Sequence, residues 1–366
     1  MKVTVSRTDL RDAIARVIPA VAVKPSVPVI AGIYMKAEHS GLTLRATNFN
    51  LDITAKIPAN VETAGDIVAT GKFFSQIVNK LGGEIVTLSD ANNQLTIRSD
   101  AASFDILTMD AGDFPSELKL SEGAAAFRIR RDALKDSIRK TVFACAKEDS
   151  RPVFAGVNFT LSGTDFRARA TNASRIAFFQ AKTFDAADAN IIVHANALRA
   201  LQNALGTDSF VTCEFDSQHA TFSFDNIRFT TRLINGNFPP ADKLVPQNCA
   251  TTAEVEVSEL RAAIERMQVI STDNGYNQIS MAFTQDGLAI STSSDSIGKA
   301  IENVDADVTG SDAALAFNCA FILDVLKVID GFKVQFGINE PLAPAKIIDN
   351  DDPDFVYVVT PLRTHA

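Results

Sequence analysis

The sequence predicts an α+β protein made of three repeated domains, each with two helices packed on antiparallel sheets. Two tetrapeptides recur 124 residues apart: Arg45-Ala46-Thr47-Asn48 as Arg169-Ala170-Thr171-Asn172, and Gly112-Asp113-Phe114-Pro115 as Gly236-Asn237-Phe238-Pro239. A longer pattern of an apolar strand followed by a helix starts at Ile67, Ile191 and Leu315, again at steps of 124. Patterns that share one offset indicate three copies of a unit of roughly 122 residues. Two helices among many short strands are typical of α+β domains.

Each unit opens with a strand and a helix. Apolar residues alternate with polar ones at 3–5, 127–129 and 255–257, which is the period of a half-buried strand. Apolar residues at helical spacing follow, such as Leu10, Ile14 and Val17 in the first unit. The first helices are therefore expected over 7–19, 130–143 and 258–270, and the third begins two residues early, so the repeat is imperfect.

Short alternating strands follow the first helix, and the aligned segments then predict a second helix in each unit. These second helices are expected over 71–81, 195–205 and 319–329, and the first of them places Phe73, Ile77, Val78 and Leu81 on one face. Apolar periodicity lapses near 121–125 and 246–252. We therefore expect domains over 1–122, 126–246 and 250–366.

Composition excludes several classes of protein. With 46% hydrophobic and 22% charged residues, the chain has no apolar run long enough for a membrane span. Its first ten residues lack the apolar region of a secretory signal, so a cytoplasmic protein is expected. The four cysteines form no CxxC pair and predict reduced thiols with no zinc site.

The charge is distributed unevenly along a chain whose net charge is −9. The six expected helices hold 14 basic and 7 acidic residues, whereas the rest holds 21 basic and 37 acidic residues. The helices thus carry +7 and everything else −16, which is typical of a protein with one polyanion-binding surface. On the helix at 130–143, Arg139 and Lys140 are expected to point away from the apolar face. The alternative is that these helix faces are simply solvated.

No motif for catalysis is present. The sequence contains no GxxxxGK[ST], HExxH or GxSxG, and its two SxxK matches lack the companion motifs. The acidic run 349–354 lacks the glycine of a calcium loop and is expected to be a solvated loop. No histidine has a partner at ligand spacing. We therefore expect no catalytic residue, no metal and no cofactor.

Taken together, the triplicated unit, the Phe114-Pro115 and Phe238-Pro239 steps, the segment FILDVLKVI at 321–329 and the final YVVTPLR resemble the sliding clamp family, the β subunits of bacterial DNA polymerase III. The resemblance covers the whole chain in one register. It implies a non-catalytic processivity factor that forms a ring as a head-to-tail homodimer, with the sheets outside and the helices around duplex DNA.

The resemblance also implies two sets of surface residues. Sequence-independent DNA contacts are implied for Lys24, Lys72, Lys80, Arg131, Lys135, Arg139 and Arg199. The subunit boundary is implied to include Lys72, Phe104, Val269 and Ile270. This chain has Glu148 where the family often has an amide or a basic residue, so the DNA track of the middle domain is expected to differ in detail.

A partner groove between the second and third domains is implied as well. Its lining matches Phe154, Thr171, Arg175, Ile176, Pro239, Leu244, Val358, Val359, Pro361, Leu362 and Arg363. An apolar groove with a few polar anchors suits a short peptide that ends in leucine and an aromatic residue. The implied partners are the replicative polymerase, the clamp loader, repair polymerases and ligase-type proteins. Pro361 is expected to end the last strand, leaving Leu362 and Arg363 free to line the groove, and the tail 364–366 to shade it in part.

Two alternatives stay open at this point. Without the resemblance, Ile176, Leu244 and Val359 are ordinary core residues. The chain as a whole is then an open scaffold, built from repeats, that binds acidic ligands or proteins without encircling DNA. A third possibility is an enzyme with an unrecognised site between domains.

Overall fold

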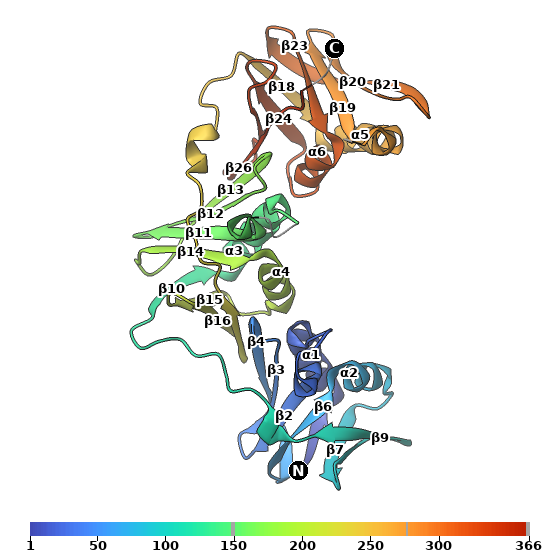
Figure 1. Cartoon of the computed structure of the whole chain (residues 1–366), viewed down its shortest axis with the longest axis vertical. Helices are drawn as coiled ribbons and strands as arrows, with labels where there is room; N and C mark the ends of the chain where they lie inside the picture. The colour runs from blue at the N-terminus through green and yellow to red at the C-terminus, as the bar shows by residue number, and fades with distance from the viewer. Residues whose placement is uncertain (148–150, 276, 364–366) are drawn as a thin grey trace. The chain divides into compact units, whose positions relative to one another are not determined.

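The computed structural model describes residues 1–147, 151–275 and 277–363 (Figure 1). The chain forms two compact units, each assembled from segments that are distant in sequence. The amino-terminal unit contains residues 1–135, 183–187 and 196–234, and the carboxy-terminal unit contains 136–182, 188–195 and the chain from 235 onward. Segments of the predicted middle domain therefore contribute to both units, and the predicted domain boundaries stay a prediction.

The amino-terminal unit is organised around one antiparallel sheet of 13 strands in the order β10-β15-β16-β17-β4-β3-β2-β6-β9-β8-β7-β1-β5. Its strands are β1 Lys2–Ser6, β2 Gly32–Glu38, β3 Gly41–Thr47, β4 Leu51–Ile57, β5 Asn60–Thr63, β6 Gly65–Thr70, β7 Ile85–Ala91, β8 Gln94–Ser99, β9 Ala102–Met109, β10 Ala125–Arg130, β15 Phe210–Phe215, β16 His219–Phe224 and β17 Ile227–Arg232. The sheet continues from the first repeat into the second because β4 pairs with β17.

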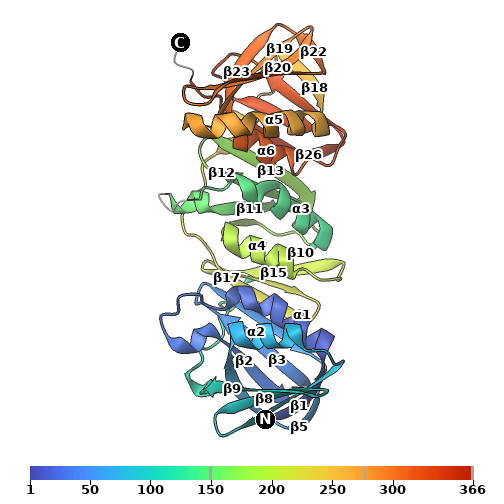
Figure 2. The same ribbon diagram turned by 90° about the vertical axis from the view of Figure 1, so that its right-hand side faces the viewer.

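Helices α1 (Arg7–Val17) and α2 (Gly71–Lys80) lie on the same face of strands β2 and β3 (Figure 2). Leu10, Ile14 and Val17 of α1 are buried, as their spacing predicts. On α2 the buried aromatic residue is Phe74, whereas Phe73 is 56% exposed. The expectation for Phe73 was wrong because Phe74, Val78 and Leu81 follow the helical spacing more closely than a face that starts at Phe73.

Two antiparallel sheets form the carboxy-terminal unit. The first has the order β14-β11-β12-β13-β26-β25-β24-β18-β22 and the second β21-β20-β19-β23. Their strands are β11 Gly156–Ser162, β12 Asp165–Thr171, β13 Arg175–Lys182, β14 Ala189–His194, β18 Thr251–Glu256, β19 Gln278–Thr284, β20 Gly287–Ser294, β21 Gly298–Val304, β22 Ala306–Gly310, β23 Ala313–Asn318, β24 Lys333–Ile338, β25 Ala345–Asp349 and β26 Asp352–Val359. The pairing of β13 with β26 joins the second and third repeats.

The remaining helices are α3 (Arg131–Thr141), α4 (Ala195–Ala204), α5 (Val257–Ser271) and α6 (Cys319–Leu326). Short 3₁₀ turns are η1 Ile18–Ala20, η2 Pro28–Ala31, η3 Ala111–Asp113, η4 Val142–Ala144, η5 Pro152–Ala155, η6 Ala241–Leu244 and η7 Thr272–Asn274. In the described residues no helix is both long and apolar enough to cross a membrane.

The repeated tetrapeptide at 45–48 and 169–172 builds the same turn twice. The Asn48 Oδ1 accepts hydrogen bonds from the backbone N–H groups of residues 50 and 51, at 3.1 and 2.9 Å. The Asn172 Oδ1 accepts from residues 174 and 175, at 3.0 and 3.1 Å. Phe49 and Ala173, which follow the two asparagines, both have a left-handed backbone, with φ of 68° and 75°. The asparagine stabilises a turn that the next residue alone disfavours.

The helices carry less positive charge than the sequence predicts. Arg130 ends strand β10 and Lys327 follows α6, so neither belongs to a helix. The six helices within their observed bounds hold 12 basic and 7 acidic residues, a net charge of +5 in place of +7. The helices are still net positive in a chain that is net negative, but their excess of positive charge is smaller than predicted.

Candidate nucleic-acid surface and partner groove

Five of the seven predicted DNA-contacting residues are exposed cations. Lys24 lies between η1 and η2, Lys72 and Lys80 lie on α2, Lys135 on α3 and Arg199 on α4. The Arg199 guanidinium also donates to the Asn196 Oδ1 at 3.1 Å. Flexible exposed cations suit contacts with phosphates, which carry no sequence information. These positions stay a prediction.

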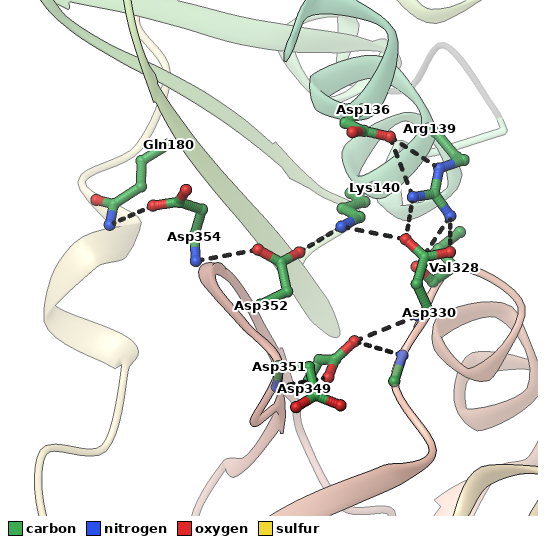
Figure 3. Close-up of polar contacts among 11 residues, drawn as sticks. Asp136, Arg139, Lys140, Gln180, Val328, Asp330, Asp349, Asp351, Asp352 and Asp354 are labelled. Carbon is green, nitrogen blue, oxygen red and sulfur yellow. Dashed lines mark hydrogen bonds and ion pairs between the residues drawn. The ribbon is translucent and has the colours of Figure 1, made fainter. Parts of the chain in front are cut away.

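The other two predicted contacts, Arg131 and Arg139, are half-buried and paired with carboxylates. Arg131 pairs with Asp132 at 2.8 Å and donates to the Gly206 carbonyl at 2.9 Å. Arg139 donates through Nη1 to the Asp330 Oδ1 at 2.9 Å and through Nε to the Asp136 Oδ1 at 3.2 Å (Figure 3). A phosphate would have to compete with these carboxylates for either side chain.

Lys140 is buried, although the helical pattern places it on the solvated face of α3. Its side chain is 6% exposed, and its Nζ pairs with Asp352 and lies 3.5 Å from Asp330 (Figure 3). The centres of the Phe179 and Phe355 rings lie 5.8 and 6.0 Å from the same nitrogen. The expectation was wrong because the start of β26 approaches α3 in the folded unit, and no sequence periodicity reports that approach. The Arg139 hydrogen bond lowers the pKa of Asp330 below its usual range.

The acidic run 349–354 spans the last residue of β25, the turn at 350–351 and the first residues of β26 (Figure 3). Asp349 is 3% exposed, and its Oδ2 accepts from the backbone N–H groups of Asp330 and Gly331 at 3.2 and 2.9 Å. The expectation of a solvated loop is therefore wrong for Asp349, whose carboxylate holds two chain segments together. No group of metal-ligating side chains occurs within the part of the chain that the structure describes.

The predicted groove residues lie together in the carboxy-terminal unit. Ile176 of β13 faces Val358 of β26, and these two side chains form a buried cluster with Ala241 of η6. Leu244, at the end of η6, is 53% exposed, and Pro239 is half-buried. An exposed leucine beside a buried aliphatic cluster can contact an apolar side chain of a partner.

Not every predicted residue is able to line a surface. Val359 is fully buried opposite Arg175, and neighbouring residues of a strand point to opposite faces, so Val358 and Val359 cannot both face a groove. Phe154, in η5, is 9% exposed. The Thr171 hydroxyl donates to the Arg175 carbonyl at 2.7 Å, so it supports the turn before β13.

Arg175 is the most constrained residue of the set. It is 4% exposed, its Nη1 donates to Asp324 at 2.8 Å, and its Nη2 donates to the Phe143 carbonyl. Its guanidinium lies 4.3 Å from the centre of the Phe321 ring. Phe321 and Asp324 of α6 therefore belong with the groove residues. Sequence reasoning found them only as members of a helical repeat, because their role comes from contact with Arg175.

The end of the chain differs from the expectation. Strand β26 ends at Val359, two residues before Pro361, as the missing N–H of proline predicts. Leu362 is not free, however, because its backbone N–H donates to the Ala316 carbonyl of β23 at 2.7 Å. Arg363 is exposed. The predictions for Glu148 and for the tail 364–366 concern residues outside those described.

The residues predicted at a subunit boundary belong to two units that each contain an open strand edge. Phe104 of β9 is 41% exposed. Residues 102–107 of β9 pair with β8 on one side, and β6 pairs with β9 only at 108 and 109. In the described structure the second edge of β9 is therefore unpaired over 102–107. Lys72 lies in the same unit. In the other unit Val269 is 74% exposed and Ile270 half-buried at the end of α5, and β21 is the last strand of its sheet.

Comparison with known families accounts for nearly the whole chain. Models of the N-terminal, central and C-terminal domains of the DNA polymerase III β subunit match residues 1–119, 128–240 and 242–363. The chain belongs to the family of DNA polymerase III β subunits. Members of this family are processivity factors and not catalytic subunits. The expectation of a non-catalytic sliding clamp is confirmed.

Relatives and solved structures agree over the full length. The beta sliding clamp of Bacillus subtilis is 29% identical over all of both chains, and that of Staphylococcus aureus is 26% identical over all of both. A crystal structure of the B. subtilis sliding clamp, 28% identical, superposes over all of both chains with a TM-score of 0.93. That of the Thermotoga maritima β subunit, 26% identical, does so with a TM-score of 0.94. The predicted fold of three clamp domains is confirmed.

Proposed function

We propose that two copies of this chain close head to tail into a ring around duplex DNA, in the cytoplasm, and tether a DNA polymerase to its template. The observation that carries the proposal is the match to sliding clamps over the complete chain in a single register. The sliding clamp family binds DNA and polymerase. A tethered polymerase rebinds at high effective concentration after each dissociation, which raises processivity without any catalytic group on the clamp.

The distribution of charge supports contact with DNA from the helices. Lys24, Lys72, Lys80, Lys135 and Arg199 are exposed, and we assign the main phosphate contacts to them. Arg131 and Arg139 are assigned weaker contacts, because each is already paired with carboxylates. Contacts of this kind are electrostatic and similar at every register of the duplex, which permits sliding.

The open edges of β9 and β21 support the homodimer. An edge strand leaves backbone N–H and C=O groups unpaired, and natural proteins cover or pair such edges. Leu107 on β9 and Ile301 on β21 are 78% and 73% exposed, so pairing of the two edges would also bury apolar side chains. In this assignment Lys72 and Phe104 of one protomer meet Val269 and Ile270 of its partner.

We assign peptide binding to the groove around Ile176, Leu244 and Val358, with Arg175 as the anchor beneath it. The proposed partners are the replicative polymerase and the clamp loader, followed by repair polymerases and ligase-type proteins. A short peptide with leucine and an aromatic side chain suits the apolar floor.

The test of the ring compares two forms of DNA. The protein is loaded by a clamp loader onto a nicked circle, half of the sample is linearised, and retention is measured by gel filtration as the salt concentration rises. We expect retention on the circle at salt that removes the protein from the linear form, because closure resists dissociation when electrostatic contacts are screened. Equal loss from both forms would favour the open scaffold.

A further inference from the structure

The two places where one repeat joins the next are built from equivalent strands. In the carboxy-terminal unit β13 pairs with β26, and Ile176 faces Val358. In the amino-terminal unit β4 pairs with β17, and Asp52 faces Thr230. Asp52 lies 124 residues before Ile176, so it takes the position of Ile176 in the repeat. Thr230 corresponds to Val358 because each is the strand partner of that position. The same junction therefore has an apolar floor in one unit and a polar floor in the other.

The arginine of the repeated tetrapeptide makes this difference possible. Arg45 donates through Nε to both carboxylate oxygens of Asp52, at 3.0 and 3.2 Å, and both side chains are less than 10% exposed. Arg169, its equivalent, donates instead to Asp242, at 2.7 Å, in the η6 turn of the loop that follows the sheet, and to the Asn158 Oδ1 at 2.9 Å. The repeat position of Asp242 is held by Leu118. The carboxylate that pairs with the arginine has thus moved from the loop in one repeat to the sheet in the other.

The chain itself lies over the polar floor. Arg45 donates to the Pro115 carbonyl at 2.7 Å, and the backbone N–H of Leu118 lies 3.4 Å from the Asp52 Oδ2. The backbone N–H of Ser121 donates to Asp216 at 2.8 Å. Leu118 and Leu120 are half-buried while residues 117 and 119 are exposed. In the second repeat the counterpart of this segment is 239–245, whose Ala241 packs with Ile176 and Val358. The covering segment is therefore common to both junctions, and the floor is what differs.

We propose that the β4–β17 junction is a second copy of the partner groove, kept closed to apolar peptides by the Arg45–Asp52 pair beneath residues 115–121 of the same chain. Each chain then offers a single groove to partners, and Asp52 is the residue that decides this. A peptide in this copy would place apolar side chains against a buried ion pair, whereas in the other junction the same positions offer aliphatic side chains. The inference rests on the proposed peptide groove at β13–β26.

The first test counts peptides bound by the unaltered protein. An acetylated hexapeptide that ends in Leu-Phe is titrated into the full chain by isothermal calorimetry. We expect one peptide per chain, and we expect the variant Leu244→Asp to bind the peptide with an affinity at least tenfold lower. Two equivalent peptides per chain would overturn the closed second copy while keeping the groove. No binding at all would contradict the groove itself, and with it this inference.

The second test opens the closed copy by exchanging residues between repeats. The variant Asp52→Ile/Leu118→Asp/Thr230→Val gives the first junction the floor and the loop carboxylate of the second. We expect a second peptide per chain, which persists when Leu244→Asp is added. A folded triple variant that still binds a single peptide would overturn the proposal.

A milder variant keeps the proposal testable if the triple variant does not fold. Leu118→Ala/Leu120→Ala weakens the seating of 115–121 and leaves the Arg45–Asp52 pair in place. We expect one peptide per chain, as in the unaltered protein, because the floor stays polar. Two peptides per chain in this variant would show that the segment alone closes the site and would overturn the role of Asp52.

Discussion

At the scale of single residues, the groove depends on an arginine that a partner scarcely touches. Arg175 is buried, stacked on Phe321 and paired with Asp324, so it connects β13 to α6 beneath the apolar cluster. The planar guanidinium stacks and donates at the same time, which the point charge of a lysine cannot reproduce. Contacts between Arg175 and α6, beneath the apolar cluster, therefore hold β13 and its residue Ile176 in place.

We predict that Arg175→Lys destabilises the chain by about 1–3 kcal/mol, since the stacking and the hydrogen bond to Phe143 are lost. Peptide affinity falls as well, because β13 carries Ile176. Arg167→Lys, at an exposed position of neighbouring β12, is the matched control and is expected to change neither. Denaturant unfolding and peptide titration measure the two effects. Unchanged stability in Arg175→Lys would contradict the anchoring role.

At the scale of elements, residues 360–362, which follow β26, make backbone hydrogen bonds to two other parts of their unit. Thr360 donates to the Ser174 carbonyl at 2.9 Å and Leu362 to Ala316 of β23 at 2.7 Å, so the segment connects the turn before β13 to the second sheet of its unit. The expectation that this segment lies free was based on Pro361, which ends the strand but does not prevent a later bridge.

We predict that deletion of 360–366 lowers peptide affinity at least tenfold and the free energy of unfolding by about 1–3 kcal/mol, from the loss of two backbone hydrogen bonds. Leu362→Ala keeps both bonds and is expected to lower affinity with a smaller change in stability. Deletion of 364–366 alone serves as the control. Calorimetric titration and thermal melting are measured on each protein, and unaltered affinity in Leu362→Ala would remove this residue from the groove.

At the scale of the whole molecule, assembly is the property that the proposed function requires. Val269 is 74% exposed at the end of α5, in the same unit as the open edge of β21. An exposed valine next to an unpaired edge is poorly placed for a monomer and well placed for a boundary between protomers.

We predict that Val269→Asp/Ile270→Asp turns a dimer into a folded monomer, because burial of unpaired carboxylates at the boundary costs several kcal/mol. Sedimentation velocity at micromolar concentration measures the mass, and circular dichroism checks the fold. Glu259→Ala, on an exposed part of the same helix, is expected to leave the dimer intact. A variant that stays dimeric would place the boundary elsewhere, and one that unfolds would place Ile270 in the core.

The triplication, the α+β class, the family and most of the helices could be predicted from the amino-acid sequence, because they depend on periodicity and on repeats. The recurring Thr-Asn turns confirm this, since a local side chain and the next residue's backbone suffice to form them. Which cations are exposed and which are buried in ion pairs depends on the folded structure. Lys140 and Arg139 lie on a helix rich in basic residues, yet Asp352 and Asp330, about 200 residues later, bind them. The same holds for Asp52 and Ile176, which take equivalent positions in the repeat but are buried against different partners, Asp52 against Arg45 and Ile176 against Val358 and Ala241. Ion pairs and buried floors of this kind join segments distant in the chain, and no local pattern encodes the distance between two side chains.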